Sequence, residues 1–463
     1  MYYRGKSYSR LKNRGYESLE TRLCLAVDFD FRDGVLTLTG DDDVNMIKLV
    51  QSADLQITAT ADGVTSTFND VQSVVVNSGE GNDHIHSSKP KDIVVVGSKI
   101  KINAGAGDDH VVLTDANEER RAFLARPVLL NSTIAAEIDL GSGRDSLKVD
   151  LRKHDTLELD LVSTDGGETV AIILLVPAVQ KIRESAARMN INIDAGGNLL
   201  TINTRGMDQV NLSLNRVAPA DLTAAPVPRQ LTDTIAIRGE HLPGTLGDAR
   251  APIAGSYTLN STLKESPGSV VIHDLWRIAT QGFGKNSLSV SGGSGRDTVS
   301  VGVNHPDFIW FPRRVSQSLE MNFNLGAGDD LLQVSTEDVA KVDAKLSLGE
   351  GNDTAIIRHR AFAIVDRTQM QVFAELGSGA DSFLLDTYGY HDIQTSLDSG
   401  PTGDGADKIL ARHLARRPRP VRYLRNSLDE GADSALAIVS KSYKTEQTVT
   451  GNQVRQTTII QEI

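Results

Sequence analysis

The chain has little cysteine, few aromatic residues and no excess of positive charge. Its 463 residues include one Cys, and only 5% are aromatic. A single cysteine excludes an internal disulfide framework and any zinc site built from several cysteines. The 48 Lys and Arg are outnumbered by 60 Asp and Glu, which disfavours a general nucleic-acid binder. The longest apolar run, around 171–176, is far shorter than the roughly 20 residues of a membrane-spanning helix.

Aspartate and glycine are the residues in excess. The chain contains 42 Asp but only 18 Glu, together with 40 Gly. Asp is a poor helix former, and both Asp and Gly favour tight turns. A chain of this length also exceeds one ordinary compact core, so we expect several domains or a repeat array. The composition favours many strands joined by turns.

A five-residue motif, Gly-x-Gly-x-Asp, occurs eight times. Within each of two clusters, successive copies begin 23 to 36 residues apart. The first cluster has three copies, and the second has five. The repeated residues are Gly79, Gly81, Asp83; Gly105, Gly107, Asp109; Gly141, Gly143, Asp145; Gly293, Gly295, Asp297; Gly326, Gly328, Asp330; Gly349, Gly351, Asp353; Gly377, Gly379, Asp381; and Gly403, Gly405, Asp407.

Short segments of alternating polar and apolar residues flank the motifs. Leu346-Ser347-Leu348 precedes one copy, and an apolar residue lies two positions after most of the Asp residues. Alternation with a period of two predicts strands, and one motif per coil predicts a solenoid whose coils bury apolar side chains against each other. We therefore expect an all-β protein, a parallel β-helix or β-roll-like solenoid with loop insertions. One or two short helices are expected, at 117–126 and 178–189.

The distribution of motifs divides the chain into five expected segments. They are a basic export-type segment (1–27), N-terminal coils with calcium-type turns (28–160), a degenerate solenoid or inserted region (161–285), C-terminal coils with calcium-type turns (286–440), and a hairpin (441–463) that turns near Gly451. The middle segment has only degenerate copies of the motif, such as Gly196-Gly197-Asn198. A separate domain is the alternative for this segment.

The motif has the chemistry of a site for a hard cation. Glycine permits a tight turn with positive φ and inward carbonyls, and the Asp places a carboxylate beside them. Calcium accepts six to eight such oxygen atoms, and an ion between successive turns would remove the repulsion within a row of carboxylates. Three and five stacked copies would give about six such sites. The alternative is a metal-free turn in which the Asp caps backbone amides.

The motif resembles the RTX, or haemolysin-type, calcium-binding repeat. The resemblance implies a parallel β-roll with Ca²⁺ held between successive turns, where the two glycines of each copy supply carbonyls and the Asp a carboxylate. The family's additional leading glycine occurs here only once, as Gly292. The copies are not tandem nonapeptides, so ions are expected on one edge of a wider helix. Arg144 and Arg296 directly precede an Asp and could replace an ion with a positive charge.

The N-terminal segment has the character of an export signal. Six basic residues lie within 1–23, but the apolar stretch 23–27 is shorter than the h-region of an ordinary secretory signal. The segment 16–26 resembles the LEPR-XLL element of large exported bacterial proteins, with Thr21 and Cys24 as departures. The resemblance implies an extracellular or cell-envelope location, and a disordered basic tail is the alternative. No surface anchor is evident in the sequence.

Other features suggest binding surfaces. His84, His86 and His110 could bind a transition metal, although exposed histidines at strand ends are commoner. The segments 308–311, rich in aromatics, and 412–425, rich in arginine, could contact a sugar or an anionic polymer, or form surface loops. No nucleophile elbow, phosphate loop or dinucleotide fingerprint is present.

We expect a non-enzymatic, calcium-binding exported protein with a structural or adhesive role. A cell-surface or matrix polysaccharide is its expected macromolecular partner. The alternatives are a glycan-binding adhesin and a β-helix polysaccharide lyase or epimerase. Such an enzyme would need acids and bases that converge on one sheet face.

Overall fold

A computed structural model describes the protein from residue 27 onward, with gaps. The described residues are 27–53, 55–88, 98–114, 133–151, 156–164, 167–175, 185–218, 230–240, 255–265, 271–304, 317–361, 368–389, 392–398, 400, 407–414, 423–428, 434–440, 445–449 and 456–460. No helix occurs within these ranges, and none of their segments could cross a membrane as a helix.

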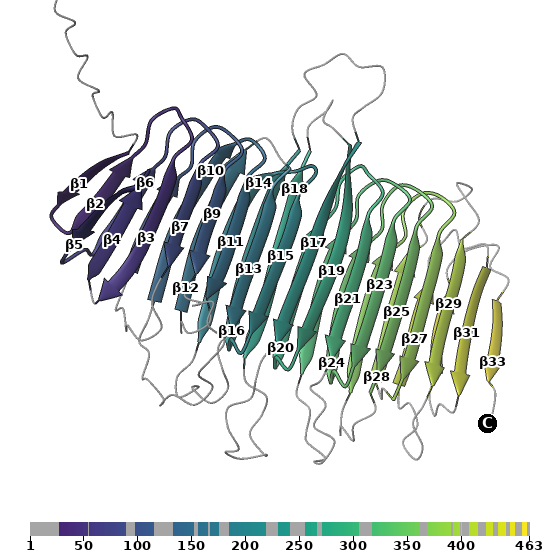
Figure 1. The fold of residues 1–463 in the computed structure, drawn as a ribbon. Coiled ribbons are helices and arrows are strands. Elements are labelled where there is room, and N and C mark those ends of the chain that lie inside the picture. The colour runs from purple at the N-terminus through teal and green to yellow at the C-terminus, as the bar shows by residue number, and fades with distance from the viewer. Residues whose placement is uncertain are drawn as a thin grey trace, which may run out of the picture.

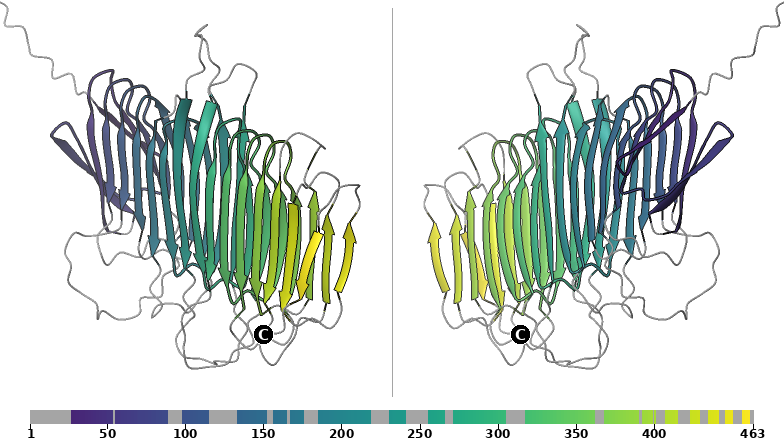
Figure 2. Two further views of the ribbon diagram at one scale, coloured as in Figure 1. Left: turned by 90° about the vertical axis from the view of Figure 1, so that its right-hand side faces the viewer. Right: turned by 90° about the vertical axis from the view of Figure 1, so that its left-hand side faces the viewer.

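The described strands form two long parallel sheets that run side by side along a rod (Figure 1; Figure 2). Sheet A contains β1 (Asp28–Arg32), β2 (Val35–Thr39), β6 (Ser73–Asn77), β8 (Ser98–Asn103), β10 (Thr133–Ser142), β12 (Thr156–Thr164), β14 (Ala186–Asp194), β16 (Gln209–Val217), β18 (Ser256–Lys264), β20 (Lys285–Ser291), β22 (Ser318–Asn324), β24 (Lys341–Ser347), β26 (Gln369–Glu375), β28 (Asp392–Asp398), β30 (Tyr423–Leu428) and β32 (Thr445–Val449).

Sheet B contains β3 (Met46–Ala53), β4 (Gln56–Ala61), β5 (Val64–Phe68), β7 (His84–Ser88), β9 (His110–Thr114), β11 (Ser146–Leu151), β13 (Thr169–Leu175), β15 (Leu199–Arg205), β17 (Gln230–Glu240), β19 (Val271–Gln281), β21 (Thr298–Asn304), β23 (Leu331–Glu337), β25 (Thr354–Arg360), β27 (Ser382–Tyr388), β29 (Lys408–Leu414), β31 (Ser434–Ser440) and β33 (Gln456–Ile460).

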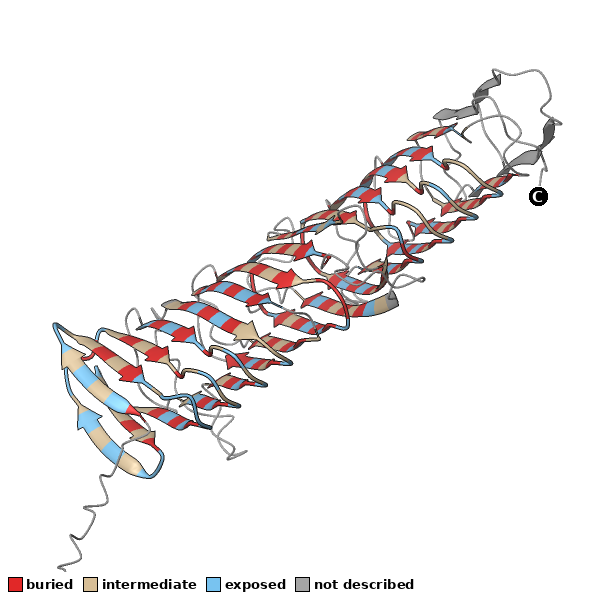
Figure 3. Ribbon diagram, turned by 90° about the horizontal axis from the view of Figure 1, so that it is seen from above, coloured by how far each residue is buried: buried red, intermediate tan, exposed pale blue. Residues whose placement is uncertain are grey.

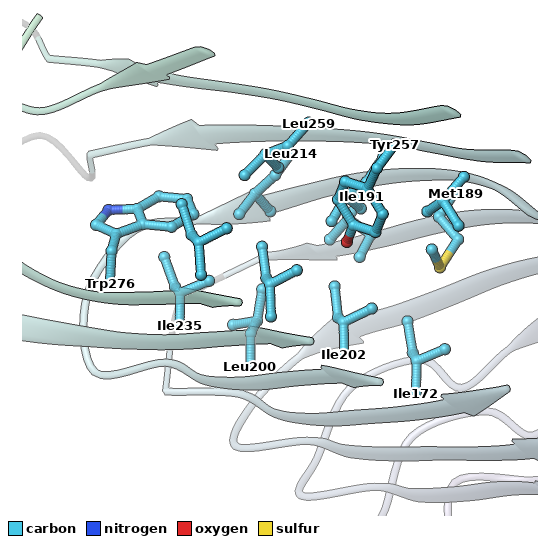
Figure 4. Close-up of a cluster of buried hydrophobic side chains, with 14 of the residues drawn as sticks. Ile172, Met189, Ile191, Leu200, Ile202, Leu214, Ile235, Tyr257, Leu259 and Trp276 are labelled. Carbon is cyan, nitrogen blue, oxygen red and sulfur yellow. The ribbon is translucent and has the colours of Figure 1, made fainter. Parts of the chain in front are cut away.

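Each coil supplies one strand to each sheet, and its apolar side chains point between the sheets. Along β22, Leu319, Met321 and Phe323 are buried, whereas Glu320 and Asn322 are exposed. The same alternation recurs from coil to coil (Figure 3). Strands of one sheet pair in parallel and in register, so residues of one kind stack in rows along the rod. The largest apolar side chains fill the middle coils (Figure 4).

The N-terminal end of the rod departs from the parallel pattern. Strand β1 pairs antiparallel with β2, and β4 pairs antiparallel with both β3 and β5. The ring of Phe68 in β5 lies 6.2 Å from that of Phe29 and 5.7 Å from that of Phe31, measured between centroids. These contacts cover the first coil, where an open sheet edge would otherwise present unpaired backbone groups and apolar side chains.

The predicted fold class, an all-β solenoid of parallel strands, is confirmed. The strands between residues 161 and 285 pair in register within the same two sheets. The helix predicted at 178–189 is wrong over its last four residues, because β14 begins at Ala186; an alternating strand and an amphipathic helix are difficult to distinguish over so short a segment. The remainder of that prediction and the helix predicted at 117–126 lie outside the described residues.

The predicted C-terminal hairpin is also wrong. Strand β32 pairs in parallel with β30, and β33 pairs in parallel with β31. The two last strands therefore belong to different sheets and form one more coil. Two alternating segments with a Gly-Asn pair between them suit either arrangement, and only the non-local partner strands distinguish a coil from a hairpin.

Candidate functional site

The Gly-x-Gly-x-Asp turns stack along one edge of the rod. In the first copy, for example, the turn joins β6 to β7, which begins directly after Asp83. The turns approach so closely that a Cβ on Gly105 would lie 1.7 Å from the carbonyl oxygen of Gly79, and Gly105 has a φ of +99°. Only glycine combines that conformation with that proximity, which explains why the motif repeats.

The aspartates form a buried hydrogen-bonded ladder. The amide of Asp83 donates to Oδ1 of Asp109 at 2.7 Å, and the amide of Asp109 donates to Oδ1 of Asp145 at 2.8 Å. In the second cluster, the amide of Asp330 donates to Oδ1 of Asp353 at 2.8 Å. The same link, at 2.7 or 2.8 Å, joins Asp297 to Asp330, Asp353 to Asp381 and Asp381 to Asp407. Each carboxylate therefore caps the preceding coil.

The ladder continues through the segment that lacks the motif. The amide of Asp145 donates to Glu168, that of Glu168 to Asn198, and that of Asn198 to Asp233. The ladder has two stretches. The first begins where the amide of Asn45 donates to Asp83, and the second begins where the amide of Asp274 donates to Asp297. The members that sequence reasoning did not assign as site residues are Asn45, Glu168, Asn198, Asp233 and Asp274. They share one feature, a buried apolar residue two positions later, but polar residues outside the ladder such as Asn286 share it too.

A second, exposed ladder uses the residue just before the Asp. The amide of Asp108 donates to Oδ1 of Asn82 at 2.8 Å, and the amide of Asn352 donates to Oδ1 of Asp329 at 2.8 Å. Here the side chain caps the following coil, whereas the buried Asp caps the preceding one. Both polar positions of the turn therefore satisfy backbone amides, which is the geometry expected of the metal-free alternative.

In the part of the chain that the structure describes, arginine neutralises the buried ladder at one place, between its two stretches. Arg216 is fully buried and donates to both carboxylate oxygens of Asp274, at 2.5 and 2.6 Å. It also donates to Asp233 at 3.2 Å, and its guanidinium carbon lies 5.1 Å from the ring centroid of Trp276. Sequence reasoning missed Arg216, because its partners lie 17 and 58 positions away.

Neither of the arginines that precede an Asp has that neutralising role in the described residues. Arg144 and Arg296 are exposed in their turns. Their side chains form no ion pair with Asp145 or Asp297 within the part of the chain that is described. Their backbone amides instead donate to Asp108 and to His273. Arginine at this position of the motif therefore adds charge at the surface.

Burial makes the ladder carboxyls weak acids. It raises the pKa of Asp109 to about 7, and the nearby charges of Asp145 and Asp83 act in the same direction. Burial likewise raises the pKa of Asp330 to about 8 and that of Asp297 to about 9. The pKa of Asp353 is raised by burial too. At neutral pH the charged form of these groups therefore lowers the stability of the folded chain, by about 1.4 kcal/mol for each unit by which the pKa is raised up to that pH.

The donor atoms of the ladder suit calcium in kind, but they are few. In Asp109, Asp330 and Asp353, the Oδ2 atom is buried and accepts no hydrogen bond from a described residue. The carbonyl oxygens of Gly79 and Gly105, however, already accept amides of the next turn. Within the described ranges, no group of three or more His, Cys, Asp or Glu could hold a metal. A calcium ion would need most of its six to eight ligands from beyond these carboxylates.

The stacking changes at the fourth copy and again near the last one. Neither Gly293 nor Gly295 has the positive φ expected of the motif, and near the last copy the stacked glycine is Gly400. A Cβ on Gly400 would lie 1.6 Å from the carbonyl oxygen of Gly377, and Gly400 has a φ of +83°. Gly400 therefore occupies the stacking position that the motif assigns to Gly403. Gly403 and Gly405 lie outside the described residues, whereas Asp407 is buried and continues the ladder.

The remaining candidate surfaces are mostly beyond the described residues. Segment 308–311 and most of 412–425 fall outside them. The rings of His84 and His110 lie 5.8 Å apart between centroids, in adjacent coils of sheet B. Burial lowers the pKa of His110, and His84 and His86 act in the same direction, so the pair favours the neutral form of His110.

The fold and the turns define the class: a parallel β-helix rod with a stacked Gly-x-Gly-x-Asp edge. Comparison with family models, with curated proteins and with solved structures finds no match. The geometry of the rod is therefore the basis for inferring its function.

Proposed function

We propose that the protein is an exported, non-enzymatic rod with a structural or adhesive role at the cell surface or in the matrix, and that it binds calcium along its turn edge. The observation that carries the proposal is the buried carboxyl ladder. It extends through coil after coil, and among the described residues arginine neutralises it only at the Arg216 junction. A ladder of this kind requires protons or cations at neutral pH, and calcium is the hard cation that its oxygen atoms suit.

The rod shape supports a structural role. Stacked coils contact only their neighbours, so a solenoid can extend in one direction while every coil keeps the same local packing. Because the ladder connects successive coils through short hydrogen bonds, it opposes separation and rotation of the coils. An extracellular setting also fits calcium sites of low affinity, for which dissociation constants of about 10⁻⁴–10⁻³ M are typical.

The test is a set of thermal melts of the full chain at pH 8 and at pH 5, in millimolar calcium and in chelator, with equilibrium dialysis to count bound ions. We expect calcium to raise the melting temperature strongly at pH 8 and little at pH 5, where protons already neutralise the ladder. A site with calcium at 100 times its dissociation constant would add about 2.7 kcal/mol, and about six ions are expected from motif stacking. Zero or one bound ion, with identical melts in calcium and chelator at pH 8, would refute calcium binding along the stacked turns.

A second candidate, a glycan-binding adhesin, is favoured by one observation. Acids, an arginine and amides converge on the outer face of sheet A between β12 and β18. Incubation of the protein with uronate polymers, followed by detection of unsaturated products, distinguishes a polysaccharide lyase from the rod and the adhesin.

A further inference from the structure

The outer face of sheet A has a polar hollow in the middle of the rod. The hollow measures about 620 Å³ and crosses β12, β14, β16 and β18. Because the strands are in register, its side chains form two rows along the rod axis. One row is Glu158, Arg188 and Asn211, and the other is Asp160, Asn190, Ser213 and Asn260.

These side chains have no partner among the described residues, unlike several others on the same face. None of the seven forms a side-chain hydrogen bond or ion pair with another described residue. On the same face, Asn215 donates to Asn192 at 2.8 Å, and Thr262 donates to Asn215 at 3.1 Å. One coil away from β12, Lys101 pairs with Glu137. The hollow therefore concentrates hydrogen-bond donors and acceptors that no described residue uses.

We propose that this hollow binds a neutral oligosaccharide that lies along the rod axis. This inference deepens the adhesive part of the proposed function by assigning a site and a ligand class. Two carboxylates and one guanidinium, together with amides and a hydroxyl, match a ligand whose hydroxyl groups both donate and accept. The second row spans three steps between strands, roughly 14 Å at about 4.8 Å each, which suits an extended chain.

The lining disfavours other ligand classes. Glu158 and Asp160 outnumber Arg188, so the hollow has a net negative charge that repels a polyuronate or a nucleic acid. No aromatic residue lines it, and its apolar lining residues Leu159, Met189 and Leu212 are buried, although exposed aromatic and apolar anchors dominate protein–protein interfaces. A hydroxyl-rich, uncharged polymer is the class that remains.

Titration calorimetry of the full chain tests the site. The probes are cellohexaose, xylohexaose, laminarihexaose and mannohexaose, with hexagalacturonate as the charged comparison. We expect at least one neutral probe to bind. Asn190→Ala, Asn260→Ala and Glu158→Gln should each weaken its binding at least tenfold, without a change in melting temperature.

The rod itself supplies matched controls. Asn322 lies in the same row as Asn260, and Glu320 in the same row as Glu158, but both are in β22, outside the hollow, and equally exposed. Asn322→Ala and Glu320→Gln should keep the dissociation constant within twofold. The inference is overturned if no neutral probe binds at millimolar concentration, if only hexagalacturonate binds, or if the controls weaken binding as much as the hollow variants.

The calcium melts separate this inference from the proposed function. The hollow variants leave the turn edge intact, so they should respond to calcium as the wild type does. Loss of glycan binding with an unchanged calcium response assigns the effect to the hollow. Failure of the calcium experiment alone would refute the ion but leave the glycan result standing.

Discussion

The backbone amide of Asp83 donates to the carboxylate of Asp109, 26 positions later in the chain, at 2.7 Å. Both residues are buried, so this bond joins adjacent coils inside the rod. The bond needs only one carboxylate oxygen, and the other oxygen of Asp109 is buried and accepts no hydrogen bond from a described residue. The Asp of the motif therefore caps a backbone amide. It is at the same time a buried acid, and its negative charge must be neutralised.

The first prediction concerns pH. The folded carboxyls have pKa values of about 7 for Asp109, about 8 for Asp330 and about 9 for Asp297, against the usual 3.8. Between pH 3.8 and these raised pKa values, the folded chain binds more protons than the unfolded chain. The free energy of unfolding therefore falls as pH rises over this interval. We expect the calcium-free melting temperature to decrease from pH 5 to pH 9 when measured by circular dichroism in chelator. A melting temperature that rises over this interval would contradict the buried-acid ladder.

The second prediction separates the charge of the ladder from its hydrogen bond. Asn in place of Asp109 keeps an oxygen that accepts the amide of Asp83, and it resembles the protonated acid. Asp109→Asn should therefore match the wild type at pH 5, exceed it in melting temperature at pH 9 in chelator, and gain less from calcium. The control is Asp42→Asn, since Asp42 is exposed and has no side-chain partner among the described residues. A purely capping role would leave the two variants alike at every pH.

The third prediction tests the close approach of the turns. Gly351 has a φ of +135°, and a Cβ there would lie 2.0 Å from the carbonyl oxygen of Gly328. Gly351→Ala should destabilise the protein by more than the 1–2 kcal/mol of a left-handed alanine, because the coils must also separate. In Gly302→Ala the new Cβ meets nothing closer than 4.0 Å and φ is not positive, so that variant should change stability by less than about 1 kcal/mol. Urea unfolding of both variants gives the comparison.

The fourth prediction concerns the buried junction. Arg216→Met removes a cation that contacts both Asp233 and Asp274, and it leaves two buried carboxylates together. Loss of one partner from a buried ion pair costs about 3–5 kcal/mol, so we expect a large decrease in stability at neutral pH that becomes smaller at pH 5. Arg238→Met is the control, because Arg238 is exposed and its nitrogen lies 3.8 Å from Glu240. An exposed pair of that kind contributes about 0–1 kcal/mol.

Local features of the chain were sufficient to predict the rod. Alternation such as Leu319, Met321 and Phe323 requires only that one face of a strand is buried. The repeated glycines require a turn that only glycine can form, as at Gly105. Both requirements act within a few residues, so they are visible in the sequence. The buried position of Asp83 and its repeats follows from the same spacing.

Pairing between coils was decided only by the tertiary structure. Glu168 and Asn198 belong to the ladder although their turns lost the motif, because the ladder requires an acceptor in register and not a particular turn sequence. Arg216 meets Asp274 58 positions away, and β32 and β33 take partners in different sheets. Stacking in register brings together residues separated by whole coils of variable length, and no local pattern encodes that distance.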